Sequence, residues 1–222
     1  MARLARVVAP GLPHHVTQRG NRRQKVFFGA DDYALYKRLL REHARAAGLE
    51  VWAWCLMPNH VHLVLVPPSA AALAVALREA HRRYTAHVNR RHGWAGYLWQ
   101  GRFASAVLDQ THLLAAARYI ERNPVRAGLA AHPGDWPFSS ARAHLRRRSD
   151  GLVRTKPLLD LVPDWQAFLA ADPPDDAVQA LRRAQRTGRP LGDEAFLLAL
   201  EEKLGRRLRR RKPGPKGQGE AA

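Results

Sequence analysis

Hydrophobic residues in the first 130 positions follow two spacings, which predict the elements of the fold. Alternating apolar and polar positions are typical of strands, and apolar residues three and four positions apart are typical of helices that pack on a core. One long apolar run is broken by Pro58 and Asn59, which predicts a turn between two strands. The predicted elements are, in order, a strand at 15–19, a helix at 31–47, a hairpin at 49–68, a helix at 69–91, a strand within 97–108 and a helix at 109–128.

The order strand, helix, two strands, helix, strand predicts an α+β fold. It matches the ferredoxin-like split βαβ pattern, which is an antiparallel sheet with helices on one face. The last predicted helix is an addition to this pattern, and we expect Pro124 to interrupt it and Gly128 to end it. Strand alternation also predicts that Trp52 and Trp54 share one face of the sheet.

The composition of the chain changes after Gly128, where prolines and arginines become frequent. We therefore expect a first domain at 1–135, an Arg-rich helical extension at 136–205 and a disordered basic tail at 206–222. Within 172–210 the pattern predicts two helices separated by the segment TGRPLGDE.

The charge of the chain is strongly positive, with 37 Lys and Arg against 19 Asp and Glu, a formal net charge of +18. This excess predicts a polyanionic partner, either nucleic acid or an acidic membrane surface. No run of about 18 apolar residues and no signal-like start is present, so we expect a soluble cytoplasmic protein that does not enter a membrane. The single cysteine, Cys55, excludes a disulfide within the chain and a cysteine-cluster zinc site.

His60 and His62 lie two positions apart in the second strand of the hairpin, so their side chains project from the same face. Two imidazoles can share one divalent metal and leave coordination positions open for substrate oxygens. A lone His-x-His pattern is more often structural, however, with both histidines on a solvated face or one of them in the core. The pattern leaves both interpretations open.

A metal on a basic protein suggests phosphate chemistry, which requires a nucleophile. Among the five tyrosines, Tyr119 lies on the last predicted helix and Asn123 follows one turn later on the same face. A metal or base beside a tyrosine hydroxyl can activate it, and the Asn123 carbonyl could be a third metal ligand. The alternative is that Tyr119 only packs in the core. Pro124 also disfavours the helical conformation at Asn123, which could distort the alignment.

Several segments together resemble a known family. PNHVHLVL resembles the His-hydrophobe-His motif of the HUH single-strand endonucleases, and ARYIERNPVRAGL is similar to the nucleophile helix of the single-tyrosine HUH transposases. HHVTQRGNRRQKVFF, LWQGRF and TGRPLG resemble the REP-associated branch of these transposases. The resemblance extends in order from about Pro13 to Leu129.

The resemblance implies a ferredoxin-like domain that cuts and rejoins single-stranded DNA beside hairpins through a 5′-phosphotyrosine. It implies that His60 and His62 bind Mg²⁺ or Mn²⁺ and that Tyr119 is the nucleophile. Asn123 stands where transposon-borne relatives usually carry a glutamine that helps to hold the metal, and its ligand role is an expectation. The predicted DNA contacts are Arg19, Arg102 and Arg122 to phosphates, Tyr97 to an unpaired base, and Arg207 and Arg210 in the basic C-terminal segment.

Two other functions fit the same residues. One is a catalytically silent protein that binds DNA hairpins for regulation, and the other is a metal-dependent RNA-processing enzyme. We expect a monomer or a homodimer, associated with the nucleoid, in which Tyr119 serves the histidines of either its own chain or a partner.

Overall fold

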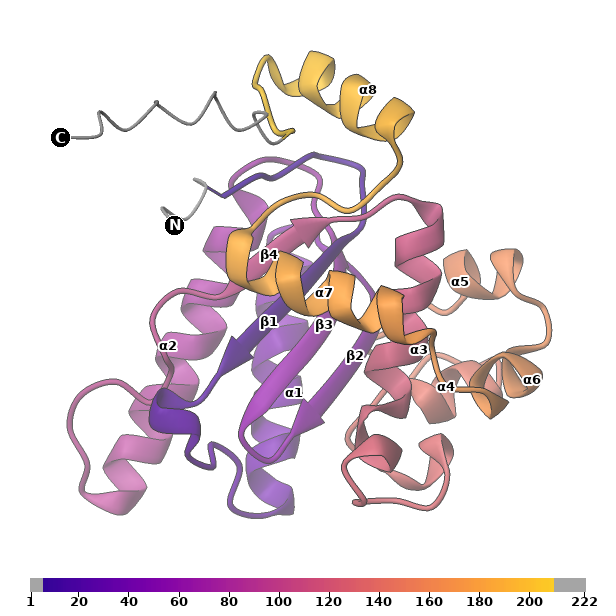
Figure 1. Ribbon diagram of the computed structural model, residues 1–222. Helices are drawn as coiled ribbons and strands as arrows, with labels where there is room; N and C mark the ends of the chain where they lie inside the picture. The colour runs from indigo at the N-terminus through magenta and orange to yellow at the C-terminus, as the bar shows by residue number, and fades with distance from the viewer. Residues whose placement is uncertain (1–5, 210–222) are drawn as a thin grey trace, which may run out of the picture.

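The computed structural model describes residues 6–209 of the chain, and its strands form one antiparallel sheet (Figure 1). The strand order is β2-β3-β1-β4, so the two central strands are the first of the fold and the second of the hairpin. The predicted α+β sheet is therefore confirmed. Its strands are β1 (His14–Arg19), β2 (Glu50–Met57), β3 (His60–Val66) and β4 (Ala104–Val107).

Helices cover both faces of this sheet. Helices α1 (Ala30–Ala46) and α2 (Ala72–His92) pack together on one face, as the split βαβ pattern predicts. Helix α3 (Gln110–Arg126), the addition to that pattern, packs on the opposite face (Figure 1). The alternating side chains of β2 and β3 thus contribute to two separate hydrophobic cores.

The first strand of the hairpin contains an irregularity that overturns one prediction. The pairing of β2 with β3 shifts between Val51 and Ala53, so the strand has a bulge there. An extra residue breaks the alternation of a strand, so residues two positions apart across the bulge point to opposite faces of the sheet. Trp54 consequently packs with α1 and α2, and Trp52 packs on the α3 side. The expectation that both tryptophans share one face was wrong.

Helix α3 continues past its proline. The side chain of Asp109 accepts a hydrogen bond from the backbone N–H of His112 and caps the first turn. Pro124 lies inside the last turn and is buried, and the helix ends only at Arg126. The predicted interruption was wrong, because a proline so near the C-terminus removes a single backbone hydrogen bond while its ring still packs on the core. Asn123 therefore keeps a helical position one turn after Tyr119.

The chain after residue 130 returns to the edge of the sheet. The Phe138 carbonyl accepts a hydrogen bond from Leu56 N–H at 2.8 Å, and Ser140 N–H donates to the Trp54 carbonyl at 2.8 Å. The two helices predicted in 172–210 are confirmed as α7 (Asp175–Thr187) and α8 (Glu194–Leu204). The remaining elements are η1 (Asn21–Arg23), η2 (Pro133–Asp135), α4 (Ala141–Leu145), α5 (Lys156–Leu161) and α6 (Trp165–Ala170). None of the helices within residues 6–209 combines the length and apolar character needed to cross a membrane.

A buried carboxylate joins α3 to this returning segment. Glu121 is completely buried and accepts hydrogen bonds from Ser140 Oγ, from His144 Nδ1 at 2.7 Å and from Trp165 Nε1 at 2.8 Å. Ser140 Oγ in turn accepts from Trp54 N–H at 2.9 Å. A buried charge is tolerated only when its oxygens are hydrogen-bonded, and here both are. The network therefore holds α3 in one position against the edge strand β2.

Replacing Glu121 by alanine would leave His144 Nδ1 and Trp165 Nε1 buried without an acceptor, whereas Ser140 Oγ could still donate to the Trp54 carbonyl. We expect Glu121→Ala to lower the free energy of unfolding by about 3–5 kcal/mol, as measured by urea denaturation. The matched control is Glu202→Ala, because the Glu202 side chain is exposed on α8 and should change stability by less than about 0.5 kcal/mol. Equal effects of the two substitutions would contradict a structural role for the network.

A buried histidine makes folding sensitive to acid. His14 Nδ1 donates to the Leu12 carbonyl at 2.8 Å, and Nε2 accepts from Ala9 N–H at 3.2 Å. Burial lowers the pKa of His14 to about 4, against the opposing effect of its carbonyl hydrogen bonds. The folded protein therefore keeps this ring neutral where the unfolded chain, with a pKa near 6.5, binds a proton. Because the unfolded state binds more protons, stability falls as the pH drops from about 6.5 towards 4.

We expect His14 to contribute up to about 1.4 kcal/mol per pH unit to this loss. In urea denaturation between pH 7 and pH 4.5, His14→Gln should therefore show a shallower decline of stability than the unsubstituted protein. His87→Gln, on an exposed position of α2, should leave the decline unchanged. A His14→Gln protein with the full slope would show that other groups account for the acid sensitivity.

Candidate functional site

The register of the two central strands places several polar side chains on the α3 face of the sheet. His60 lies opposite Arg19, and His62 lies opposite Thr17. Residues directly opposite in an antiparallel pair point to the same side, and so do residues two positions along. His15 therefore joins this group, diagonal to His62 across the strands.

Each of the two predicted ligands has one ring nitrogen held by a neighbour. His60 Nδ1 lies 2.6 Å from Asn59 Oδ1, which accepts only, so this nitrogen carries the hydrogen. His62 Nδ1 lies 3.1 Å from Nε2 of His15, and the two rings are stacked with centroids 5.3 Å apart. The His60 and His62 rings meet edge to face at 4.9 Å. The contacts thus fix the orientation of both rings.

The three histidines are kept neutral. Burial lowers the pKa of His15 to about 4. Burial and then the nearby Arg19 lower the pKa of His60 to about 3, and burial together with His60, His15 and Arg19 brings that of His62 well below its usual value. A neutral imidazole is the form that binds a metal, so no proton has to be displaced at neutral pH.

Tyr119 projects from α3 towards the same histidines. Its ring meets His62 edge to face at 5.5 Å and His15 at 6.4 Å, and the side chain is 8% exposed. Among the described residues its hydroxyl forms no hydrogen bond, so the oxygen is available to a substrate. These histidines belong to the same chain as Tyr119, and the contact needs no partner.

Two further residues of α3 lie beside the tyrosine. Asn123, one turn later, has its Nδ2 atom buried without a hydrogen-bond partner within residues 6–209. Arg126, a second turn later, places its guanidinium 5.6 Å from the centre of the Tyr119 ring. This face of α3 therefore carries a phenol, an amide and a guanidinium in successive turns.

The polar groups that face each other here fit a divalent metal. Nε2 of His60 and Nε2 of His62 form no hydrogen bond within the described residues, so both are available to a metal. Asn123 can offer only its Oδ1 as a ligand, because its buried atom without a partner, Nδ2, is a donor. No group of three or more His, Cys, Asp and Glu side chains able to hold a metal occurs in that part of the chain. The candidate ligand set is thus two imidazoles with an amide, which leaves positions for substrate oxygens.

The predicted DNA-contacting residues lie in different surroundings. Arg19 is exposed beside His60 and belongs to the site. Arg122 instead points to the C-terminal segment, where it pairs with Asp172 at 2.8 Å and donates to the Leu169 carbonyl. Tyr97 and Arg102 are exposed on the loop before β4. Arg207 is exposed after α8, and Arg210 lies outside the described residues.

Sequence reasoning did not single out His15 and Arg126 as site residues. Arg126 could have been found from its spacing of seven positions after Tyr119, which keeps it on the same helical face. His15 could not, because its place beside His62 depends on the pairing register of two strands separated by 40 residues and a helix.

Comparison with known proteins identifies the family. The family model described as "Transposase IS200 like" matches residues 10–123. The REP-associated tyrosine transposase of Escherichia coli K12 is 23% identical over 128 residues, which are 57% of this chain and 74% of that protein. A relative from Haemophilus influenzae with the same family name is 28% identical over 102 residues, covering 41% of this chain and 58% of that protein.

A solved structure, described as a REP-associated tyrosine transposase bound to a REP hairpin, has the same fold. It superposes with a TM-score of 0.57 at 24% identity, over 69% of this chain and 89% of that one. The family model covers just over half of the chain and ends at Asn123 on α3, so it includes every candidate residue around the histidines and Tyr119 except Arg126. The chain therefore belongs to the family of IS200-like transposases, with REP-associated tyrosine transposases among its relatives.

Proposed function

We propose that this protein is a metal-dependent endonuclease and strand transferase that cleaves and rejoins single-stranded DNA next to REP-like hairpins. The observation that carries the proposal is the contact between Tyr119 and His62. It puts the Tyr119 ring beside two neutral imidazoles, and Asn123 follows Tyr119 by one turn of α3. The Tyr119 hydroxyl forms no hydrogen bond within residues 6–209. A protein that only bound hairpins would have no need of this arrangement, and so we favour catalysis.

His60, His62 and Asn123 would hold Mg²⁺ or Mn²⁺. When bound, such an ion would withdraw electron density from the scissile phosphate and neutralise part of its charge. His15 and Asn59 would orient the two histidine ligands through contacts with their Nδ1 atoms. If His62 Nδ1 donates to His15 Nε2, as His60 Nδ1 donates to Asn59, both histidines present an Nε2 lone pair. Such outer partners fix the tautomer and orientation of a ligating ring.

In the cleavage step, the Tyr119 oxygen attacks the phosphorus in line with the bond to the 3′-oxygen. An O–P bond forms to the tyrosine, the bond to the 3′-oxygen breaks, and the proton of the tyrosine hydroxyl is transferred overall to that 3′-oxygen, which leaves as a 3′-OH. The 5′-phosphotyrosine keeps the energy of the broken bond, so attack by another 3′-OH rejoins strands without a nucleotide cofactor. Catalysis then depends on positioning and on charge neutralisation.

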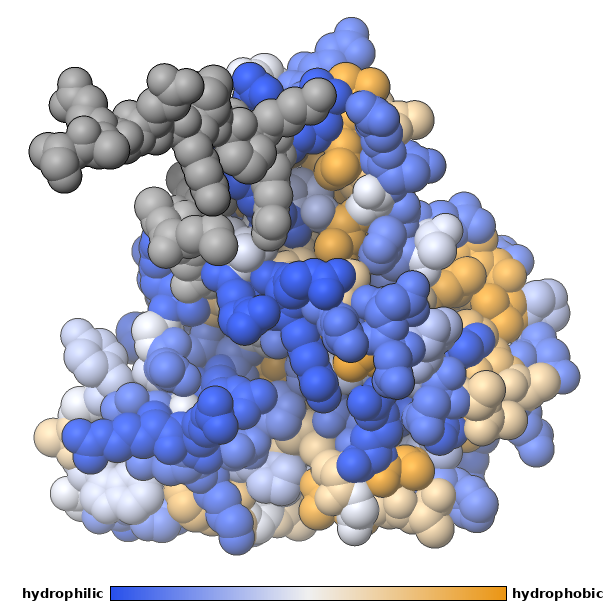
Figure 2. Space-filling view, in the orientation of Figure 1, coloured by the Kyte–Doolittle hydropathy of each residue, from blue (hydrophilic) through white to orange (hydrophobic). Residues whose placement is uncertain are grey.

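Cationic side chains would guide the DNA to this point. Arg19 beside His60 and Arg126 beside Tyr119 are suited to the phosphates at the cleavage site. Arg122 is occupied by Asp172 and Leu169, so in our proposal it anchors α6 to α3. Helix α7 exposes Arg182, Arg183 and Arg186, and hydrophilic residues gather in the middle of this face (Figure 2).

The helical segment at 136–205 and Arg207 would extend this basic surface along a hairpin. The positive net charge of the chain would then supply affinity that falls with salt. We place the protein accordingly on the chromosome, in the cytoplasm.

The nucleophile can be tested by covalent trapping. Incubating the protein with Mn²⁺ and a labelled oligonucleotide, which carries a hairpin and a single-stranded flank, should give a protein–DNA adduct on a denaturing gel. Tyr119→Phe should abolish the adduct and leave binding intact, because only the hydroxyl is lost. The matched control is Tyr33→Phe, a buried tyrosine on α1 that stacks on Phe138 and should keep the adduct.

The same experiment separates the competing functions. An adduct that persists in Tyr119→Phe would refute the assignment of the nucleophile. His60→Ala combined with His62→Ala should remove the Mn²⁺-dependent reaction. Tight hairpin binding without any adduct would instead support the regulatory protein, and an adduct on RNA alone would support RNA processing.

His15 can be tested by the contrast between two substitutions. His15→Gln keeps an acceptor near the place of Nε2, and His15→Leu removes it. We expect His15→Leu to weaken Mn²⁺ binding about 10- to 100-fold by isothermal titration calorimetry, and His15→Gln to stay within a few-fold of the unsubstituted protein. If both substitutions weakened binding equally, the histidine would act by packing and not by orienting His62.

A further inference from the structure

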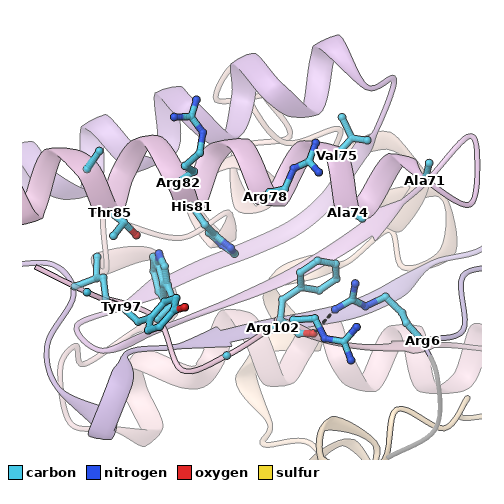
Figure 3. A pocket seen from close by; sticks show the side chains of 16 residues that line it. Arg6, Ala71, Ala74, Val75, Arg78, His81, Arg82, Thr85, Tyr97 and Arg102 are labelled. Atoms are coloured by element: carbon cyan, nitrogen blue, oxygen red, sulfur yellow. Dashed lines mark hydrogen bonds between the residues drawn. The ribbon is translucent and has the colours of Figure 1, made fainter.

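A cavity of about 670 Å³ lies on the other face of the sheet, between α2 and the loop that leads to β4. Figure 3 shows its two walls, with Val75, Arg78 and Arg82 on α2 and Tyr97 and Arg102 across from them. Its size is in the range of pockets that hold a small ligand or a nucleotide. The buried rings of Trp99 and Phe103 also line it, so the interior is apolar.

Among residues 6–209, the charged side chains that line the cavity are arginines, and no Asp or Glu of that range lines it. The arginines are Arg6, Arg78, Arg82 and Arg102. Two of these arginines share one acidic partner, because the Glu79 carboxylate pairs with Arg78 at 3.5 Å and with Arg82 at 2.9 Å. A positive excess therefore remains around an apolar interior, which is the complement of a base flanked by phosphates.

One aromatic ring at the cavity is exposed to an unusual degree. Tyr97 is 87% exposed, whereas Leu98 and Trp99, which follow it, are buried. An exposed aromatic ring interleaved with arginines is the arrangement that proteins use to stack unpaired bases of a single strand. The sequence had singled out Tyr97 and Arg102, and the fold adds two arginines of α2 across the cavity.

The cavity lies next to the proposed catalytic site along the backbone. Gln100 N–H donates to the Arg19 carbonyl at 2.8 Å, and Asn21 N–H donates to the Leu98 carbonyl at 2.8 Å. Arg19 is the residue opposite His60 in the sheet. The wall of the cavity and the proposed metal ligands are thus attached to the same end of β1, on opposite faces of the sheet.

We propose that this cavity binds an unpaired base of the single-stranded DNA that flanks the cleavage site. The base would stack on Tyr97, and its neighbouring phosphates would contact Arg78, Arg82 and Arg102. A strand that passes over the end of β1 would then be held on one face and cut on the other. The inference rests on the proposed function, because it assigns a subsite to the same DNA substrate.

The test uses the full chain with Tyr119→Phe, so that cleavage does not interfere with binding. Two hairpin oligonucleotides are compared, one with a single-stranded flank and one without. Adding Tyr97→Ala should weaken binding of the flanked hairpin about tenfold and leave the blunt hairpin unchanged, whereas Tyr97→Phe should retain the affinity. With 2-aminopurine at successive flank positions, one position should show a fluorescence change on binding that Tyr97→Ala removes.

Arg102→Ala and Arg90→Ala form a matched pair, because both remove one exposed arginine and only the first lines the cavity. Arg102→Ala should weaken binding of the flanked hairpin more than binding of the blunt hairpin. Arg90→Ala should affect both affinities equally. Equal losses on both hairpins with Arg102→Ala, or a preference of the cavity for RNA of the same sequence, would overturn the subsite. These results are independent of the Tyr119 adduct, so failure of the subsite and failure of the catalytic proposal can be told apart.

Discussion

The arrangement of this protein depends on how α3 is fastened across the sheet. The helix carries Tyr119 on one side and, two residues later, the buried carboxylate of Glu121 on another. That carboxylate accepts hydrogen bonds from Ser140, His144 and Trp165, which belong to the segment returning along β2. A buried charge with three donors has one low-energy geometry. The rotation of α3 about its axis is thereby set, and with it the direction of Tyr119.

The segment after residue 130 therefore helps to position Tyr119, because its side chains hold Glu121 of α3 in place. Arg122 of α3 also contacts this segment, since it donates to the Leu169 carbonyl and pairs with Asp172. Helix α7 packs against both α3 and β4. The returning segment also hydrogen-bonds with the edge strand β2, which covers backbone groups that could otherwise pair with another chain. Helix α3, which carries the proposed nucleophile, is therefore packed on both sides by segments of its own chain.

The sheet separates two kinds of surface at one end of β1. On the α3 face, strand pairing brings Arg19, His60 and His62 together, and a second layer of His15 and Asn59 orients the rings. On the α2 face, the loop before β4 is tied to the same strand end and forms one wall of an apolar, arginine-lined cavity. Because β1 is central, both surfaces are attached to a rigid element, which suits a reaction that depends on positioning.

The sequence by itself determined the strands and long helices between residues 14 and 126 and their order, and it supplied the candidate residues for the proposed chemistry. The alternation of His60 and His62, the spacing of Tyr119 and Asn123, and the capping residue Asp109 act over a few positions and need no tertiary information. Only the tertiary structure decided that β1 lies beside β3 in a register that puts His15 on His62. Only packing decided that Pro124 stays within α3 and that a bulge sends Trp52 and Trp54 to opposite faces. The physical reason is that strand register, bulges and buried charge networks are set by groups far apart in the chain, whose mutual distances no local pattern records.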